Sequence, residues 1–162
     1  NGVAFCPHCD GPFFKNKDVA VIGGGNSGLE ASIDLAGIAK SVTIFEFLPE
    51  LKADQVLIDR AFSKDNITIN TDSQTTQILA SSTGVSGIEY RDRNSNKIHR
   101  QELTGIFVQI GLVPNSKFIE DIIKLNKYGE IIKCEFGTKH FIWHVCFSNM
   151  FFYANYYNLK GD

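Results

Sequence analysis

The stretch Asp18-Val-Ala-Val-Ile-Gly-Gly-Gly-Asn-Ser-Gly28 runs from an apolar strand into a glycine turn, and a helical pattern follows it over 29–39. Its glycines at positions 23, 25 and 28 fit the spacing G-x-G-x-x-G. In that motif the first glycine turns the chain tightly, the second lets a pyrophosphate approach the backbone, and the third lets the helix pack on the strand. We therefore predict that Gly23, Gly25 and Gly28 form a phosphate-binding turn.

The residues around this turn supply the context that the motif requires. Ser27 and Glu30 are spaced as a capping box, which would fix the helix start so that its free N–H groups face an anion. A second apolar strand, Ser41–Phe45, ends at Glu46, close to the acidic position expected about 20 residues after the motif. We predict that Asn26, Ser27 and Glu46 also bind the cofactor. The alternative is a glycine-rich turn in some other parallel α/β unit.

Composition limits the possible partners. The chain has 162 residues, 43% of them hydrophobic and 21% charged, and a formal net charge of -2, which fits one globular domain without a basic field. We therefore expect no nucleic-acid partner. No apolar segment reaches the roughly 18 residues that span a bilayer. The N-terminal residues also lack the charged and then apolar pattern of a secretory signal. We therefore expect a cytoplasmic protein with no membrane contact. Because the chain starts at Asn1 and not at Met, we expect a piece of a longer protein.

Residues 5–11 read Phe-Cys-Pro-His-Cys-Asp-Gly and place two thiols, Cys6 and Cys9, one helical turn apart. Pro7 suits the first turn of a helix, and both the helix start and His8 favour the reactive thiolate. We predict a redox dithiol and no metal site. Two alternatives are a pair of inert cysteines and one half of a zinc site. The distant zinc ligands would come from Cys134, His140, His144 and Cys146.

The rest of the chain alternates helical and strand-like patterns. A helical spacing covers 53–64, and an apolar run over 105–111 is typical of a buried parallel strand. Short strand-like pieces at 67–70, 74–80, 85–91 and 98–103 are separated by turn residues. We predict an α/β fold, a Rossmann-like nucleotide-binding domain with a parallel sheet and an inserted β-meander.

The pattern changes towards the C-terminus. A helix is predicted over 117–125 and the start of a strand at 129–132. From 133 on, aromatic residues accumulate without helical or strand periodicity. We predict an NAD(P)-binding domain over 1–132, with its Cys-x-x-Cys segment at 6–9. A divergent, poorly packed tail would follow over 133–162, and it also resembles translation in a wrong frame.

Three ordered motifs identify a family. Cys-Pro-His-Cys-Asp-Gly, Val-Ala-Val-Ile-Gly-Gly-Gly-Asn-Ser-Gly and Gly-Ile-Phe-Val-Gln-Ile-Gly-Leu-Val-Pro-Asn closely resemble the flavoprotein disulfide reductases of the thioredoxin reductase and alkyl hydroperoxide reductase type. The resemblance covers the nicotinamide-binding domain of such an enzyme. It implies that Cys9 faces the flavin, that Cys6 attacks the partner's disulfide and that Asp10 is the acid–base group. For Asp10 a plain turn or cap residue is the alternative. Gly111 and Pro114 resemble the loop near the nicotinamide.

The family also implies a reaction. Hydride passes from the nicotinamide to FAD, and electrons then pass to the dithiol and on to a disulfide partner, a peroxiredoxin or a thioredoxin-like protein; a homodimer is expected for the parent enzyme. The family's flavin motifs belong before Cys6 and after 129–132, outside this stretch. We therefore expect FAD in the parent and an inactive chain alone. The alternatives are a stand-alone dinucleotide-binding or redox-sensing module without flavin, and a decayed gene product.

The sequence after the second strand predicts NAD(H) over NADP(H). Thioredoxin reductases tend to carry a His-Arg-Arg run there, whereas this chain reads Glu46-Phe-Leu-Pro49. Glu46 can accept hydrogen bonds from ribose hydroxyls, but it would repel a 2′-phosphate. The nearest cation after Glu46 in the sequence is Lys52.

Overall fold

The computed structural model describes residues 1–111 and 113–132. It divides into two compact units, Asn1–Gly111 and Leu112–Asp162, and each is described by itself. The first unit ends at Gly111, before the domain boundary predicted at 132. The predicted tail, 133–162, lies outside the described residues.

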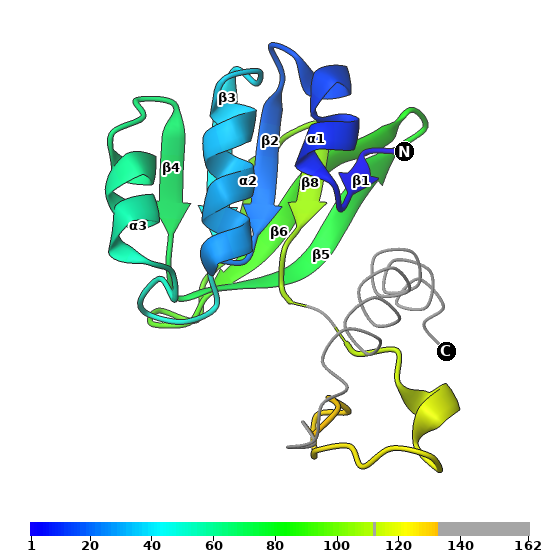
Figure 1. Ribbon diagram of the computed structural model, residues 1–162. Coiled ribbons are helices and arrows are strands. Elements are labelled where there is room, and N and C mark those ends of the chain that lie inside the picture. The colour runs from blue at the N-terminus through cyan, green and yellow to red at the C-terminus, as the bar shows by residue number, and fades with distance from the viewer. Residues whose placement is uncertain (112, 133–162) are drawn as a thin grey trace. The chain divides into compact units, whose positions relative to one another are not determined.

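The first unit contains a parallel sheet in the strand order β1-β8-β2-β3-β4 (Figure 1). Its strands are β1 (Val3–Ala4), β2 (Asp18–Ile22), β3 (Ser41–Phe45), β4 (Ile67–Asn70) and β8 (Gly105–Val108). The helices are α1 (Pro7–Asp10), which continues into the 3-10 turn η1 (Gly11–Phe14), then α2 (Asn26–Ala36) and α3 (Gln55–Phe62). The predicted α/β class with a parallel sheet is confirmed.

Between β4 and β8 the chain forms a second, antiparallel sheet. Its strands are β5 (Ser73–Ser81), β6 (Gly84–Asp92) and β7 (Ile98–Glu102). Figure 1 shows α2 and α3 on one face of the parallel sheet and this second sheet behind it. The inserted β-meander is therefore confirmed, and it forms a third layer.

Alternate residues of the parallel strands face two separate cores, as the period of a strand requires. In β2, Val19 and Val21 pack with Leu29 and Leu35 of α2. Ala20 between them packs on the other side, against Ile88 of the second sheet and Leu103, which directly follows β7. A continuous apolar strand is thus buried on both faces.

The predictions for the second unit were wrong. In place of a helix over 117–125 there is one 3-10 turn, η2 (Lys117–Ile119), and in place of a strand at 129–132 there is an isolated bridge between Leu125 and Ile131. The apolar spacing is helical, but Ile122 is 79% exposed, and a short helix that finds no packing surface among the described residues is not stable in water.

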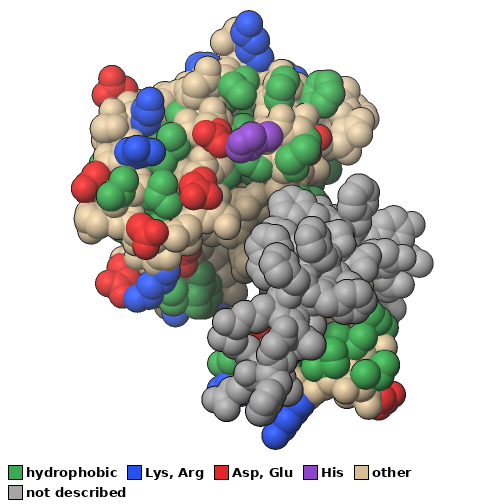
Figure 2. Space-filling view, in the orientation of Figure 1, with side chains coloured by type: hydrophobic (Ala, Val, Ile, Leu, Met, Phe, Trp, Pro, Cys, Tyr) green, Lys and Arg blue, Asp and Glu red, His purple; other side chains and the backbone are tan. Residues whose placement is uncertain are grey.

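The surface of the described residues is mixed. On the face shown in Figure 2, acidic, basic and apolar side chains are interspersed. None of the helices in the described ranges is long and apolar enough to cross a membrane.

The strand–turn–helix junction depends on two glycines. Gly23 has a φ of +114°, and a Cβ there would overlap the carbonyl oxygen of Gln109 in the strand connection beside it. A Cβ at Gly28 would overlap the carbonyl oxygen of Gly23. Helix α2 therefore lies closer to the end of β2 than a residue with a side chain at position 28 would allow.

We predict that Gly28→Ala lowers the free energy of unfolding by about 2–3 kcal/mol, because the new methyl group forces α2 away from β2. Gly25→Ala is the matched control, since a Cβ at Gly25 would meet only the carbonyl oxygen of Lys52, at 3.7 Å. Urea denaturation of both variants measures the difference. Equal stability of the two would contradict this account of the junction.

Candidate dinucleotide and dithiol site

The glycine turn lies where the order of the parallel strands reverses. Strand β2 pairs with β3 on one side and with β8 on the other, all three parallel. In open sheets of this kind, ligands bind outside the carboxyl ends of the strands at such a point. The segments that leave β2, β3 and β8 therefore outline the candidate site.

Helix α2 begins differently from the prediction. Gly25 is the N-cap, with extended backbone angles (φ -83°, ψ -176°) and no side-chain cap, so the capping box of Ser27 and Glu30 was wrong. Because the helix begins at Asn26, Ser27 lies in its first turn. The first N–H groups of a helix have no acceptor within it.

The start of α2 fits the phosphate group that the motif implies. The space beside Gly25 is open apart from Lys52, whose carbonyl oxygen is 3.7 Å from the Cβ position. An 11-residue helix directs its positive dipole end and its free N–H groups at that space. The backbone at Gly25 and Ser27 can thus bind a pyrophosphate.

The side chain of Asn26 has a structural partner. Its Nδ2 donates to Oδ2 of Asp54 over 3.1 Å, and its Oδ1 accepts from the backbone N–H of Asp54 over 2.8 Å. Asp54 is the N-cap of α3. Asn26 therefore connects the starts of the two helices, and its backbone is the part left for a ligand.

Glu46 is 8% exposed at the end of β3 and contacts the glycine turn directly. Its Oε2 accepts from the backbone N–H of Gly24 over 2.5 Å, and its Oε1 accepts from that of Leu48 over 2.8 Å. A carboxylate has about four acceptor positions, so two remain for ribose hydroxyls. The predicted ribose-binding residue thus also holds the glycine turn in place.

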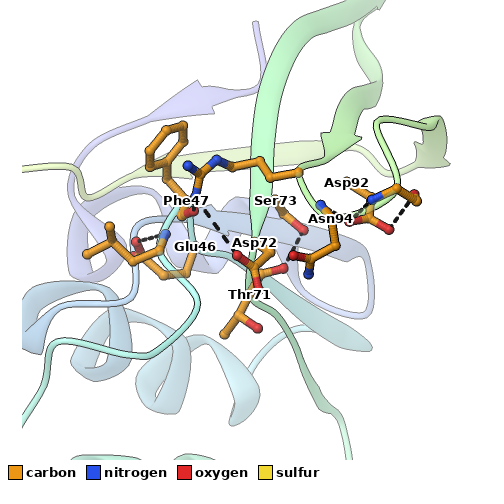
Figure 3. Close-up of polar contacts among 10 residues, drawn as sticks. Glu46, Phe47, Thr71, Asp72, Ser73, Asp92 and Asn94 are labelled. Atoms are coloured by element: carbon orange, nitrogen blue, oxygen red, sulfur yellow. Dashed lines mark hydrogen bonds and ion pairs between the residues drawn. The ribbon is translucent and has the colours of Figure 1, made fainter.

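Arg93 also lies at this edge, and sequence reasoning missed it. It comes from the turn between β6 and β7, and its Nη1 donates to the carbonyl oxygen of Phe47 over 2.8 Å. Figure 3 shows Phe47 and Asp72 at this edge, on two different segments of the chain. Lys52, the nearest cation after Glu46 in the sequence, instead pairs with Glu50.

Cys6 and Cys9 form a disulfide, with their Cα atoms 5.3 Å apart. Cys6 is the N-cap of α1, and Cys9 lies within that helix, where its backbone N–H donates to Cys6 Sγ over 3.2 Å. Asp10 ends the same helix, and in the described part of the chain its carboxylate makes no capping bond to η1. The other candidate zinc ligands all lie outside the described residues.

Gln109 connects the disulfide segment to the nucleotide turn. Its Nε2 donates to the carbonyl oxygen of Phe5, next to Cys6, over 2.8 Å, and its backbone N–H donates to that of Ile22, directly before the glycine turn, over 2.8 Å. Sequence reasoning missed this role. The signal that could have found it is a single amide in the apolar run over 105–111.

A cleft of about 410 Å³ lies beside the disulfide helix, between α1, α2 and α3. At its rim the Nε2 of His8 is 3.5 Å from Oδ2 of Asp34. Ser27 and Gln109 reach the same cleft, which therefore extends from the disulfide segment to the start of α2. Its lining consists of Pro7, His8, Ser27, Glu30, Ala31, Ile33, Asp34, Leu57, Arg60 and Gln109.

The two predicted nicotinamide-loop residues fall in different units. Gly111 closes the first unit with a φ of +97°, and no atom of the described residues lies within 4 Å of its Cβ position. Pro114 belongs to the second unit. The structure therefore brings Cys6, Cys9, the glycine turn and Glu46 into one unit, without Pro114.

Known proteins resemble this chain closely. An alkyl hydroperoxide reductase subunit of Escherichia coli (strain K12) is 57% identical over 141 residues, which are 85% of this chain and 27% of that protein. The protein of the same name from Staphylococcus aureus (strain NCTC 8325) is 59% identical over 131 residues, or 81% of this chain and 26% of that protein. The chain thus spans about a quarter of these relatives.

Solved structures agree with the fold. Thioredoxin reductase of Lactococcus lactis has a TM-score of 0.79 and 31% identity, over 83% of this chain and 45% of that one. Thioredoxin reductase of T. acidophilum has a TM-score of 0.79 and 34% identity, over 83% and 44%. The resemblance to the thioredoxin reductase type is confirmed. Because the family model of pyridine nucleotide-disulphide oxidoreductases also matches residues 1–142, the chain belongs to that family.

Proposed function

We propose that this chain is the nucleotide-binding and dithiol-bearing part of an NADH-dependent disulfide oxidoreductase. The parent enzyme would carry FAD, held by segments outside this chain, and would reduce a peroxiredoxin or a thioredoxin-like protein. The observation that supports this most directly is the Cys6–Cys9 disulfide, which lies in the same compact unit as the glycine turn. Gln109 contacts both segments.

Each part of the site has a task in this proposal. NADH would supply hydride and FAD would relay its two electrons to the disulfide. The N–H groups at the start of α2 bind the pyrophosphate, and Glu46 accepts hydrogen bonds from the ribose. These contacts fix the adenosine half of the cofactor at the carboxyl edge of β2 and β3.

The reduced dithiol would then react by thiol–disulfide exchange. The Cys6 thiolate attacks the partner's disulfide to give a mixed disulfide, and Cys9 resolves it, which restores the Cys6–Cys9 bond and leaves the partner as a dithiol. Asp10, at the end of the same helix, would protonate the sulfur that leaves. His8, which lies between the two cysteines in the sequence, would favour the thiolate.

NADH is expected to bind at least about tenfold more tightly than NADPH, because the carboxylate of Glu46 repels the charge of a 2′-phosphate. Titration of both nucleotides against the 162-residue chain, followed by nicotinamide fluorescence, measures the two dissociation constants. Gly25→Ala should weaken both, since its methyl group enters the phosphate space. Tighter binding of NADPH would refute the assignment of NADH.

We also predict that the chain alone sustains no turnover with NADH, free FAD and a small disulfide. The hydride donor and the dithiol need a flavin held against both. That flavin site would lie in the rest of the parent enzyme. The measurement is NADH oxidation at 340 nm, against Cys9→Ser as the control. Sustained oxidation that Cys9→Ser abolishes would show a complete minimal reductase.

A separate experiment tests the dithiol itself. Thiol labelling followed by peptide mapping should modify Cys6 and Cys9 after mild reduction and leave both unlabelled after oxidation. Nucleotide binding without this reversible change would favour a plain dinucleotide-binding module.

A further inference from the structure

Arg93 places a positive charge next to the proposed ribose site. The centre of its guanidinium lies 3.9 Å from the ring centroid of Phe47, and its Nη1 donates to the carbonyl oxygen of that residue. Phe47 directly follows Glu46. In dinucleotide-binding folds an arginine at this place accommodates a 2′-phosphate. Taken alone, Arg93 would therefore favour NADPH.

Asp72 already pairs with this charge. Its Oδ1 lies 3.8 Å from Nη1 of Arg93, and the Asp72 side chain is 21% exposed against 36% for Arg93. The partial burial of the Asp72 carboxylate reduces the screening of their attraction by solvent and salt. The guanidinium is thus held between an aromatic face, a carbonyl oxygen and a carboxylate.

The backbone fixes Asp72 in this position. Asp72 lies in the short connection between β4 and β5. Its N–H donates to the carbonyl oxygen of Leu48 over 3.0 Å, and its carbonyl oxygen accepts from the N–H of Arg93 over 2.8 Å. Its φ is +51°, a conformation that Asp and Asn adopt more readily than most residues. The carboxylate of Asp72 can therefore be neutralised without loss of the local fold.

We propose that Asp72 is a specificity-determining residue, which neutralises Arg93 at the carboxyl edge of the sheet and so keeps this cation from binding a 2′-phosphate. This inference rests on the proposed function. With Asp72 present, Glu46, Asp72 and Arg93 sum to one negative charge, which opposes the 2′-phosphate of NADPH. Without the charge of Asp72 the sum is zero, and Arg93 has N–H groups free for the phosphate.

Asp92, the acidic residue directly before Arg93 in the sequence, has partners of its own. Asp92 accepts from the backbone N–H of Asn94 over 2.8 Å and from the hydroxyl of Ser95 over 2.6 Å (Figure 3). These bonds hold the pKa of Asp92 below its usual range. Its charge stabilises its own turn, so Asp72 is the carboxylate that pairs with Arg93.

The test is Asp72→Asn in the full 162-residue chain, with the dissociation constants of NADH and NADPH measured at low salt. We expect the preference for NADH over NADPH to fall about tenfold, mainly through tighter NADPH binding, because one unit charge near a phosphate is removed. Asp65→Asn is the matched control. It removes the same charge from an exposed residue just before β4, at the opposite edge of the sheet, and should leave both constants unchanged.

Two further measurements separate specificity from a structural effect. Adding Arg93→Gln to Asp72→Asn should abolish the gain for NADPH, and raising the salt concentration should reduce it. If Asp72→Asn does not fold, Asp72→Gly suits the same φ and removes the same charge.

The outcomes are distinct. An unchanged preference in a folded Asp72→Asn variant that still binds NADH would overturn this inference and leave the proposed function intact. A gain for NADPH that survives the loss of Arg93 would also overturn it. If the unmodified chain binds neither nucleotide, the proposed function fails, and this inference fails with it.

Discussion

The close approach of Gly28 to the carbonyl oxygen of Gly23 is the contact on which the rest of the first unit depends. It sets α2 directly over the end of β2, so that the helix begins at the point where the strand order reverses. Because Gly25 caps the helix without a side chain, the first N–H groups stay available. One steric constraint thus determines both the packing of the sheet and the position of the anion site.

Polar groups at the carboxyl edge hold the neighbouring loops against this junction. Glu46 is nearly buried, and a buried carboxylate without partners would cost several kcal/mol. Two backbone N–H groups satisfy it, and one of them belongs to Gly24 in the glycine turn. Asn26 and Asp54 make a second connection of the same kind. The candidate site is therefore built mainly from backbone groups, which a few side chains hold in register.

The sequence predicted the elements whose signals are local. The alternation and apolar runs gave the strands, and the spacing of glycines gave the junction, because each depends on residues a few positions apart. The capping box failed because an extended Gly25 took the cap position one residue before the helix. Arg93 and Gln109 reach partners that lie 46 and 104 residues away in the sequence, and no local pattern encodes such contacts.

The inserted antiparallel sheet contributes to the unit in two independent ways. Its apolar side, which includes Ile88, covers the face of the parallel sheet that the helices leave open, together with Leu103 directly after β7. Its turn between β6 and β7 brings Arg93 to the edge where β3 ends. That turn belongs to neither of the two strand–helix–strand units, β2-α2-β3 and β3-α3-β4. Its charges can therefore change without disturbing the glycine junction. If the chain binds a dinucleotide as proposed, its preference between NADH and NADPH can therefore change through the inserted sheet while the nucleotide-binding core stays the same.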